Sequence, residues 1–247
     1  SVNNNRGVNK GYSCKTTPEY AYAHLITGYL SPDYIDTKGD GITSDDIGTA
    51  VKFNWRRTHD NYKWRIPMTS DLNNARFSEG SMLSEQDQMA NYSYGEKEIY
   101  YAHSIETKNH ILFFEISERR DGAQAIGENG GVDTSSLNLF KLDNIKLFSK
   151  KDYSANSIPI KTIHFEYSYE LCPKTVNNNE FELYLNLPPD PVPELNSEKA
   201  GKLTLKSVEI YYGNDKTGAL SPYKFDYSDS NPEYSYFKSD KWGNYKS

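Results

Sequence analysis

The sequence predicts a mainly β protein built from antiparallel sheets, and three observations support this class. The 247 residues include 21 tyrosines, 10 phenylalanines and 3 tryptophans, and aromatic residues are enriched in strands. Apolar residues alternate with polar ones in several segments, which is typical of a strand with one buried face. Short turn-rich segments separate these runs and favour antiparallel neighbours. We therefore expect β-sandwich-like sheets with long loops and one N-terminal helix.

The helix is expected over residues 18–30, after a linker or irregular edge at residues 1–15. Thr17 is a suitable N-cap, and Pro18 suits the first helical position. Apolar side chains then follow at i, i+3, i+4 and i+7, namely Tyr22, Leu25, Ile26 and Tyr29. Ser31 and Pro32 should end this helix.

Strands are expected in seven runs that are rich in β-branched and aromatic residues. These runs are 51–57, 61–67, 95–107, 110–118, 140–150, 159–171 and 201–213. Thr107–Asn109 is a predicted hairpin turn, whereas the glycine-rich residues 121–136 are expected to form a long exposed loop. Prolines between residues 188 and 193 predict an extended excursion, and the tail from residue 221 a last strand with a strap. No break in composition divides residues 16–247, which we expect to form a single domain.

Composition excludes some classes of function. The chain has 28 Lys and Arg against 34 Asp and Glu, a net charge of −6, and no basic block, so no nucleic-acid partner is expected. No stretch approaches the roughly 20 apolar residues of a membrane-spanning helix. Two cysteines, Cys14 and Cys172, are too few for a disulfide scaffold and leave open whether they pair.

Residues 36–46 are the stretch of the chain that is most similar to a metal-binding motif. Calcium loops present oxygen ligands at alternate positions, a glycine at the bend and a late carboxylate. A calcium site here would use the side chains of Asp36 and Asp40, the carbonyl of Ile42, and Asp45 or Asp46. However, Lys38 stands where Asp or Asn is usual, and the late carboxylates arrive early. These mismatches favour the alternative, a glycine turn that leads into a short helix capped by Ser44.

Two clusters in the expected strands combine tryptophan with arginine: Trp55 with Arg57, and Trp64 with Arg65. Because aromatic faces stack on sugar rings and guanidinium groups bind anions, these four residues are candidate ligand-binding residues. The alternative is structural, with the tryptophans packed inward and the flanking cations in solvent. The alternation of a strand favours this second interpretation.

No recognisable catalytic motif accompanies these clusters. The five histidines show no HExxH spacing, and the chain has no GxSxG, P-loop or dinucleotide-binding glycine pattern. Four glutamates could supply the acid and base of a β-rich glycosidase, but solvated strand faces also carry glutamates: Glu96, Glu98, Glu115 and Glu118. An enzyme is therefore the less favoured interpretation.

Several stretches of the chain carry a family resemblance, together about half of its length: residues 20–55, 94–122, 141–152, 159–172, 201–227 and 240–246. They resemble segments of very large secreted or surface proteins of Bacteroidetes. The stretch KLTLKSVEIYYGNDKTGALSPYKFDY is also similar to strand-turn segments of Rhs, SpvB and Tc-toxin shell proteins. The resemblance implies that the chain is a segment of a longer polypeptide, and it transfers no active-site residue.

These observations together predict a non-catalytic structural or interaction module of a secreted or cell-surface bacterial protein, with calcium as its candidate cofactor. Its expected partners are neighbouring modules of the same polypeptide or another surface protein. The alternative is a carbohydrate-binding or glycan-processing domain, with a glycan as ligand.

Overall fold

The computed structural model describes residues 15–66, 92–128, 130–151, 153–154, 157–176, 200–214 and 220–228. These residues form ten strands and no helix: β1 (Gly28–Leu30), β2 (Ala50–Ile66), β3 (Ser93–Glu106), β4 (His110–Glu118), β5 (Gln124–Gly127), β6 (Gly130–Asp133), β7 (Phe140–Ser149), β8 (Lys161–Val176), β9 (Ala200–Tyr211) and β10 (Tyr223–Lys224). The predicted mainly β class is confirmed. Within this part of the chain, no helix has the length and apolar character needed to cross a membrane.

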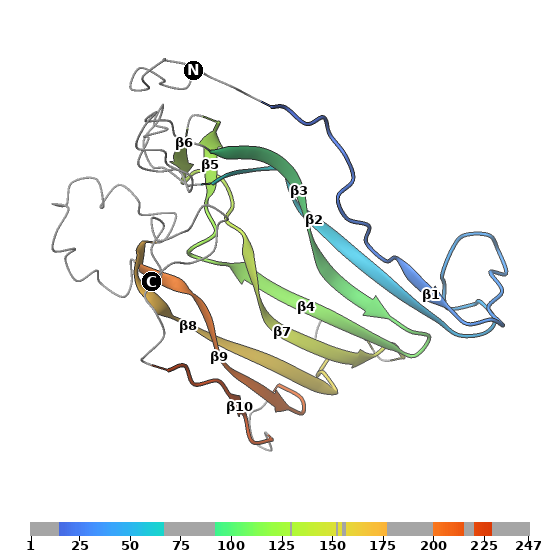
Figure 1. Cartoon of the computed structure of the whole chain (residues 1–247). Helices are drawn as coiled ribbons and strands as arrows, with labels where there is room; N and C mark the ends of the chain where they lie inside the picture. Colours follow the sequence, from blue (N-terminus) through green and yellow to red (C-terminus); the bar gives the residue numbers. More distant parts are fainter. Residues whose placement is uncertain are drawn as a thin grey trace, which may run out of the picture.

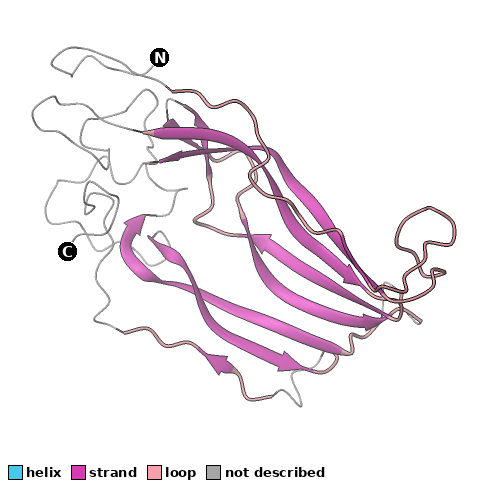
Figure 2. Cartoon of the chain, turned by 45° about the vertical axis from the view of Figure 1, so that its right-hand side comes forward, coloured by secondary structure: helices cyan, strands magenta, loops and turns pink. Residues whose placement is uncertain are grey.

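Eight strands form one antiparallel sheet in the order β1-β2-β3-β4-β7-β8-β9-β10, and β5 pairs with β6 (Figure 1). Three long two-stranded ribbons make up the centre of this sheet: β2–β3, β4–β7 and β8–β9. Short stretches of pairing join the ribbons, with Ser104–Glu106 on Ile111–Phe113 between the first two and residues 144–147 on 161–164 between the last two. The ribbons are therefore joined at one end of the sheet and diverge towards the other (Figures 1 and 2).

The register shows which side chains share a face, because directly opposed residues of antiparallel strands point the same way. One face carries rows of apolar side chains, and we call it the apolar face: Val51, Phe53, Ile105, Leu112, Phe114, Ile145, Leu147, Ile163, Phe165, Val208 and Ile210. The opposite face, the polar face, carries mainly polar rows, such as Glu115, Asn144, His164 and Glu209.

The apolar face is only half-buried along all of these positions. Inner-strand Leu, Ile and Phe side chains are usually among the most buried residues of a sheet that has a second layer on that face. The fully buried apolar side chains of the described residues lie elsewhere and are few: Tyr62, Ala123, Ala125 and Tyr211. The main sheet is therefore a single layer here, and the second layer of the expected sandwich is not among the described residues.

Residues 121–136 do not form the exposed loop that we expected. They contain the β5–β6 hairpin, which contacts the distal half of β2, and Ala123 and Ala125 are 2% and 0% exposed. The hydroxyl of Tyr62 donates to the carbonyls of Gly122 and Ala123 at 3.4 and 3.2 Å. Glycine in sequence usually indicates a turn, but here the small side chains let the backbone approach the strand closely.

The prediction of a helix over residues 18–30 was wrong. This segment runs extended beside β2 and ends in β1, with its tyrosines exposed (Figure 1). The carbonyl of Thr27 accepts the Phe53 amide at 2.9 Å, and the carbonyl of Ile26 accepts the Trp55 indole N–H at 2.8 Å. An isolated helix of this length is only marginally stable, whereas an extended chain satisfies donors at the edge of β2.

The strand predictions were largely confirmed. β3, β4, β7, β8 and β9 match five expected runs, while β2 joins the first two runs into one strand with irregular pairing. Thr107–Asn109 forms the predicted turn, in which the Thr107 amide donates to the His110 carbonyl at 2.9 Å. The proline-rich excursion, Cys14, residues 1–14 of the expected linker and the tail beyond residue 228 lie outside the described residues.

Candidate functional site

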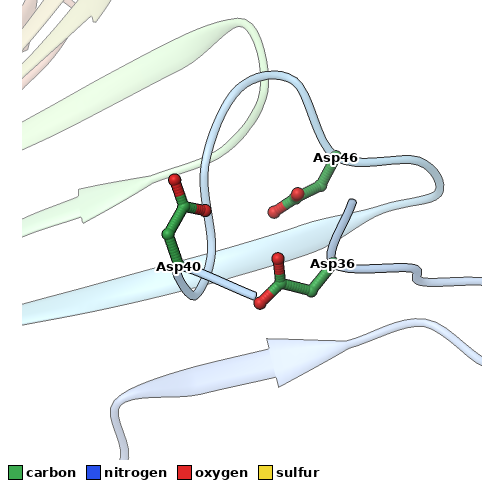
Figure 3. Close-up of side chains that lie close together, drawn as sticks. All are labelled: Asp36, Asp40 and Asp46. Atoms are coloured by element: carbon green, nitrogen blue, oxygen red, sulfur yellow. The ribbon is translucent and has the colours of Figure 1, made fainter. Parts of the chain in front are cut away.

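The loop between β1 and β2 gathers three carboxylates, those of Asp36, Asp40 and Asp46 (Figure 3). One oxygen from each lies within 4.8 Å of the other two. We call residues 36–46 the acidic loop. The three clustered carboxylates belong to three of the four aspartates that we predicted from the sequence as metal ligands.

Asp36 organises the first half of the acidic loop. Its Oδ1 accepts the amides of Lys38 and Gly39 at 3.2 and 2.6 Å, and its Oδ2 accepts the amide of Gly41 at 2.9 Å. Gly39 and Gly41 have φ values of 71° and 89°, which residues with a Cβ rarely adopt. The sequence Asp-Thr-Lys-Gly-Asp-Gly thus folds into a tight turn around one carboxylate.

Asp46 closes the loop and is 5% exposed. Its carboxylate accepts the amides of Thr43 and Thr37 at 2.8 and 3.2 Å and the Tyr34 hydroxyl at 2.7 Å. These bonds, led by the Thr43 amide, lower the pKa of Asp46, while the bond to Asp46 raises the pKa of Tyr34 to about 12. Asp46 therefore stays ionised at neutral pH.

Asp45 is separate from the three clustered carboxylates. It pairs with the Lys38 ammonium at 2.7 Å and accepts the Thr43 hydroxyl at 2.7 Å, and these bonds lower its pKa to about 2. The Ile42 carbonyl accepts the Lys52 ammonium at 3.4 Å. Residues 44–45 form a turn rather than the start of the short helix that we considered.

The donor set of the acidic loop suits a hard cation, because it consists of oxygens alone. Asp40 is exposed and makes no hydrogen bond among the described residues, so both of its oxygens are available. A calcium ion takes six to eight oxygens, so carbonyl groups or water would have to complete the set. Two ammonium groups reduce the local negative charge. Lys108 donates to the main-chain carbonyl of Asp46 at 3.2 Å, and Lys52 donates to that of Ile42.

The four candidate ligand-binding residues of β2 fall into two separate places. Trp55 and Trp64 are nine residues apart on this strand, a distance of roughly 30 Å at about 3.3 Å per residue. The Trp55 indole donates to the Ile26 carbonyl, and the Trp64 ring lies so close to Gly95 that a Cβ there would be 2.6 Å from it. The structure does not bring these two rings together.

The two arginines of these clusters also differ in their surroundings. Arg57 is exposed and pairs with Asp60 at 2.7 Å and with Glu98 at 3.0 Å. Arg65 is 4% exposed, donates to the Glu128 carbonyl at 3.1 Å and lies 4.6 Å from the centre of the Tyr92 ring. Each guanidinium group is therefore occupied by contacts within the chain.

A shallow cavity of about 710 Å³ lies on the polar face, and no pattern in the sequence indicated it. Tyr153 stacks on Phe113 with ring centres 5.4 Å apart, and Phe148 meets Tyr153 edge-on at 5.3 Å. Arg56 and His103 also line the cavity, and a guanidinium nitrogen of Arg56 lies 3.5 Å from Nδ1 of His103. An aromatic floor with a guanidinium group beside it can hold the ring of a polar ligand.

The glutamates considered as acid and base do not form an isolated pair. The Glu96 carboxylate accepts hydrogen bonds from the Tyr94 hydroxyl and the Asn61 side-chain amide. Glu98 forms an ion pair with Arg57, and Glu115 forms one with Lys146 at 2.7 Å. Glu118 accepts the Asn138 amide at 2.9 Å. Each carboxylate is held by its own neighbours in the sheet or the adjoining loop.

A buried ion pair between the ends of the ribbons is a further feature that sequence analysis missed. Arg119 donates to both oxygens of Asp121 at 2.7 Å, and Asp121 also accepts the Leu203 amide of β9 at 3.2 Å. The neighbouring amide of Arg120 donates to the Tyr169 hydroxyl of β8 at 2.9 Å. We call residues 119–128 and 130–139 the bridging segment, because they contact the first and third ribbons.

Comparison with protein-family models, curated proteins and solved structures finds no match for this chain.

Proposed function

We propose that this chain is a non-catalytic structural or interaction module of a secreted or cell-surface bacterial protein. One observation carries the proposal: a sheet of eight strands has an apolar face whose rows stay only half-buried, with no second layer on it among the described residues. Contiguous apolar surfaces that a soluble protein leaves incompletely buried mark interaction sites. The opposite face satisfies its polar groups internally, for example through the contacts of Glu115 with Lys146 and Asn144.

The apolar face would serve as the inner face of a β-sandwich, with the second layer supplied by a neighbouring module of the same polypeptide or by another surface protein. Sheets pack face to face about 10 Å apart, and side chains of both inner faces interdigitate. The rows of Ile, Leu and Phe on this face fit such an arrangement. A location outside the cell would be tested by whether protease added to intact cells degrades the protein.

An apolar dye tests whether the face is available. At submicromolar protein, anilinonaphthalene sulfonate should fluoresce strongly with the natively folded chain, and Leu112→Lys should reduce this signal. Ile111→Lys is the matched control, because Ile111 neighbours Leu112 on β4 and opposes Phe148 on the polar face. Weak dye binding, or equal binding by the chain and Leu112→Lys, would contradict the proposal.

Calcium enters this proposal as a stabilising ligand of the acidic loop. The support is the convergence of Asp36, Asp40 and Asp46 and the all-oxygen donor set. Bound calcium would offset the repulsion of the carboxylates and couple its binding to the folding of the loop.

Carbohydrate binding is the second candidate function, and the cavity on the polar face favours it. The exposed ring of Tyr153 could stack on a sugar while Arg56 binds its oxygens. Glycan-array binding should then be lost in Tyr153→Ala and kept in Trp64→Phe, which alters a ring outside the cavity. Loss in Trp64→Phe with retention in Tyr153→Ala would move the site to β2.

A further inference from the structure

We propose that the layer covering the apolar face is a second copy of this chain, so that two chains complete a β-sandwich between them. This inference rests on the proposed function, since it names the partner that the apolar face docks. The composition of the face, its symmetry, its area and the form of the sheet edges all favour a second copy.

The inner rows of the apolar face are apolar from β2 to β7 in the first row and from β4 to β9 in the second. One row runs from Phe53 through Ile105 and Leu112 to Leu147, and the next runs from Phe114 through Ile145 and Ile163 to Ile210. Lys161 enters only at the end of the first row. Homodimer interfaces are more apolar than those of transient hetero-complexes, and their centres are depleted in charge.

A face of this composition is complementary to itself. A twofold axis through the middle ribbon, β4–β7, would place Leu112, Phe114, Ile145 and Leu147 against the same residues of the second copy. Such an interface is isologous and closes after two chains. Sheets that pack face to face cross at about 30°, which the twist of each sheet already provides.

The area of the face indicates how strong this pairing is. Six strands about 4.8 Å apart, with same-face rows about 7 Å apart, cover roughly 500 Å² per chain. Two chains would then bury roughly 1,000 Å², which is at the lower end of specific interfaces. An interface of this size is typical of weak association, so we expect a reversible dimer rather than a permanent one.

The edges of the sheet favour contact through the face over contact through a strand. β1 pairs with residues 50–52 at one edge and β10 with residues 207–208 at the other, and the Thr27 carbonyl and the Phe225 amide bond to the next positions of these edges. Such short edge strands limit the continuation of a sheet into a second molecule. A second copy would therefore meet this sheet more readily face to face than edge to edge.

Sedimentation velocity of the full chain from about 1 to 100 μM tests the proposal. We expect the mass to shift from monomer to dimer over this range. Leu112→Lys should remain monomeric throughout, because it places a charge in the centre of both layers. Ile111→Lys should dimerise like the unmodified chain, because its side chain lies on the polar face.

Leu112→Asn is a milder second variant in case the lysine prevents folding, and it should weaken dimerisation at least about tenfold. Near-ultraviolet circular dichroism at low concentration would show that each variant is folded. A monomer at 100 μM, or a dimer that Leu112→Lys and Leu112→Asn leave intact, would overturn the second copy as partner. If the monomer still binds the dye, the proposed docking function stands and the partner is a different module.

Discussion

Among single residues, Asp40 differs from its two neighbours in the acidic loop, because its carboxylate takes no part in holding the loop together. Asp40→Ala should therefore leave the stability in chelator nearly unchanged, within about 0.5 kcal/mol. With calcium at a hundred times its dissociation constant, the unmodified chain should gain about 2.7 kcal/mol, and Asp40→Ala should lose this gain. Thermal unfolding with calcium and with chelator measures both effects.

Asp45→Ala is the matched control for the calcium experiment. Asp45 is the neighbour of a clustered carboxylate but pairs with Lys38, so its loss should not abolish the response to calcium. Identical melting curves of the unmodified chain in millimolar calcium and in chelator would leave the acidic loop as a structural turn only.

Asp121 is the acceptor of an ion pair whose loss should destabilise the fold. Burial alone would raise the pKa of Asp121, but the hydrogen bonds and charge of Arg119 outweigh it and lower the pKa below its ordinary value. Asp121→Asn would leave the Arg119 guanidinium without its carboxylate in a half-buried place. We expect a loss of about 3 kcal/mol in the free energy of unfolding at pH 7, measured by urea denaturation.

The pH dependence of this loss gives the prediction a second readout. A carboxyl group with a lowered pKa in the folded state adds stability above its unfolded pKa of about 3.9 and loses it as pH falls towards the folded value. The difference between the unmodified chain and Asp121→Asn should therefore shrink when the pH falls below about 4. A difference that stays constant down to pH 2 would show that the ionised carboxylate is not the cause.

Among the elements, the β8–β9 ribbon depends on the backbone at Gly201. Its φ is 91°, and a Cβ there would be 1.8 Å from the Tyr169 carbonyl oxygen of the paired strand. Gly201→Ala should cost more than about 2 kcal/mol, because the unfavourable φ and the backbone contact add together. Gly127→Ala is the control, since a Cβ at Gly127 meets nothing within 4 Å, and urea denaturation of both variants should show the contrast.

The elements also show how far sequence reasoning reaches. Alternation of Ile163 and Phe165 with His164 identified both the strand and its apolar face, because period-two patterning is local. The prediction of a helix over residues 18–30 was wrong because it rested on the apolar stripe alone. The edge of β2, which binds this segment in an extended form, lies in another part of the sequence.

The candidate site shows the same limit. The clustered aspartates were predictable, since they lie within eleven positions of one loop. The contact of Asp121 with Leu203 was not, because 82 residues separate them and only the divergence of the ribbons brings the bridging segment between β2 and β9. Sequence patterns therefore indicated the local turn but not the long-range polar contact.

For the whole molecule, the junctions between the ribbons should determine how the sheet opens. Only residues 104–106 and 111–113 pair between the first and second ribbons, and residues 144–147 and 161–164 between the second and third. The first ribbon has further bonds to the bridging segment through Tyr62, Lys63 and Arg65, whereas β8–β9 has those of Tyr169 and Leu203. Among the described residues, the third ribbon thus has the weaker attachment to the bridging segment.

We therefore expect amide hydrogen exchange to report β8–β9 as a cooperative unit that opens at a lower free energy than β2–β3. Asp121→Asn should increase this contrast, because it weakens the acceptor of the Leu203 amide while the bonds of Tyr62 and Lys63 remain. Exchange in β8–β9 should become about tenfold faster for each 1.4 kcal/mol that the variant removes from local stability, with a smaller change in β2–β3. Mass spectrometry of peptides from each ribbon measures this. Equal acceleration in all three ribbons would mean instead that the sheet opens as one unit, with the short junctions as strong as the pairing within ribbons.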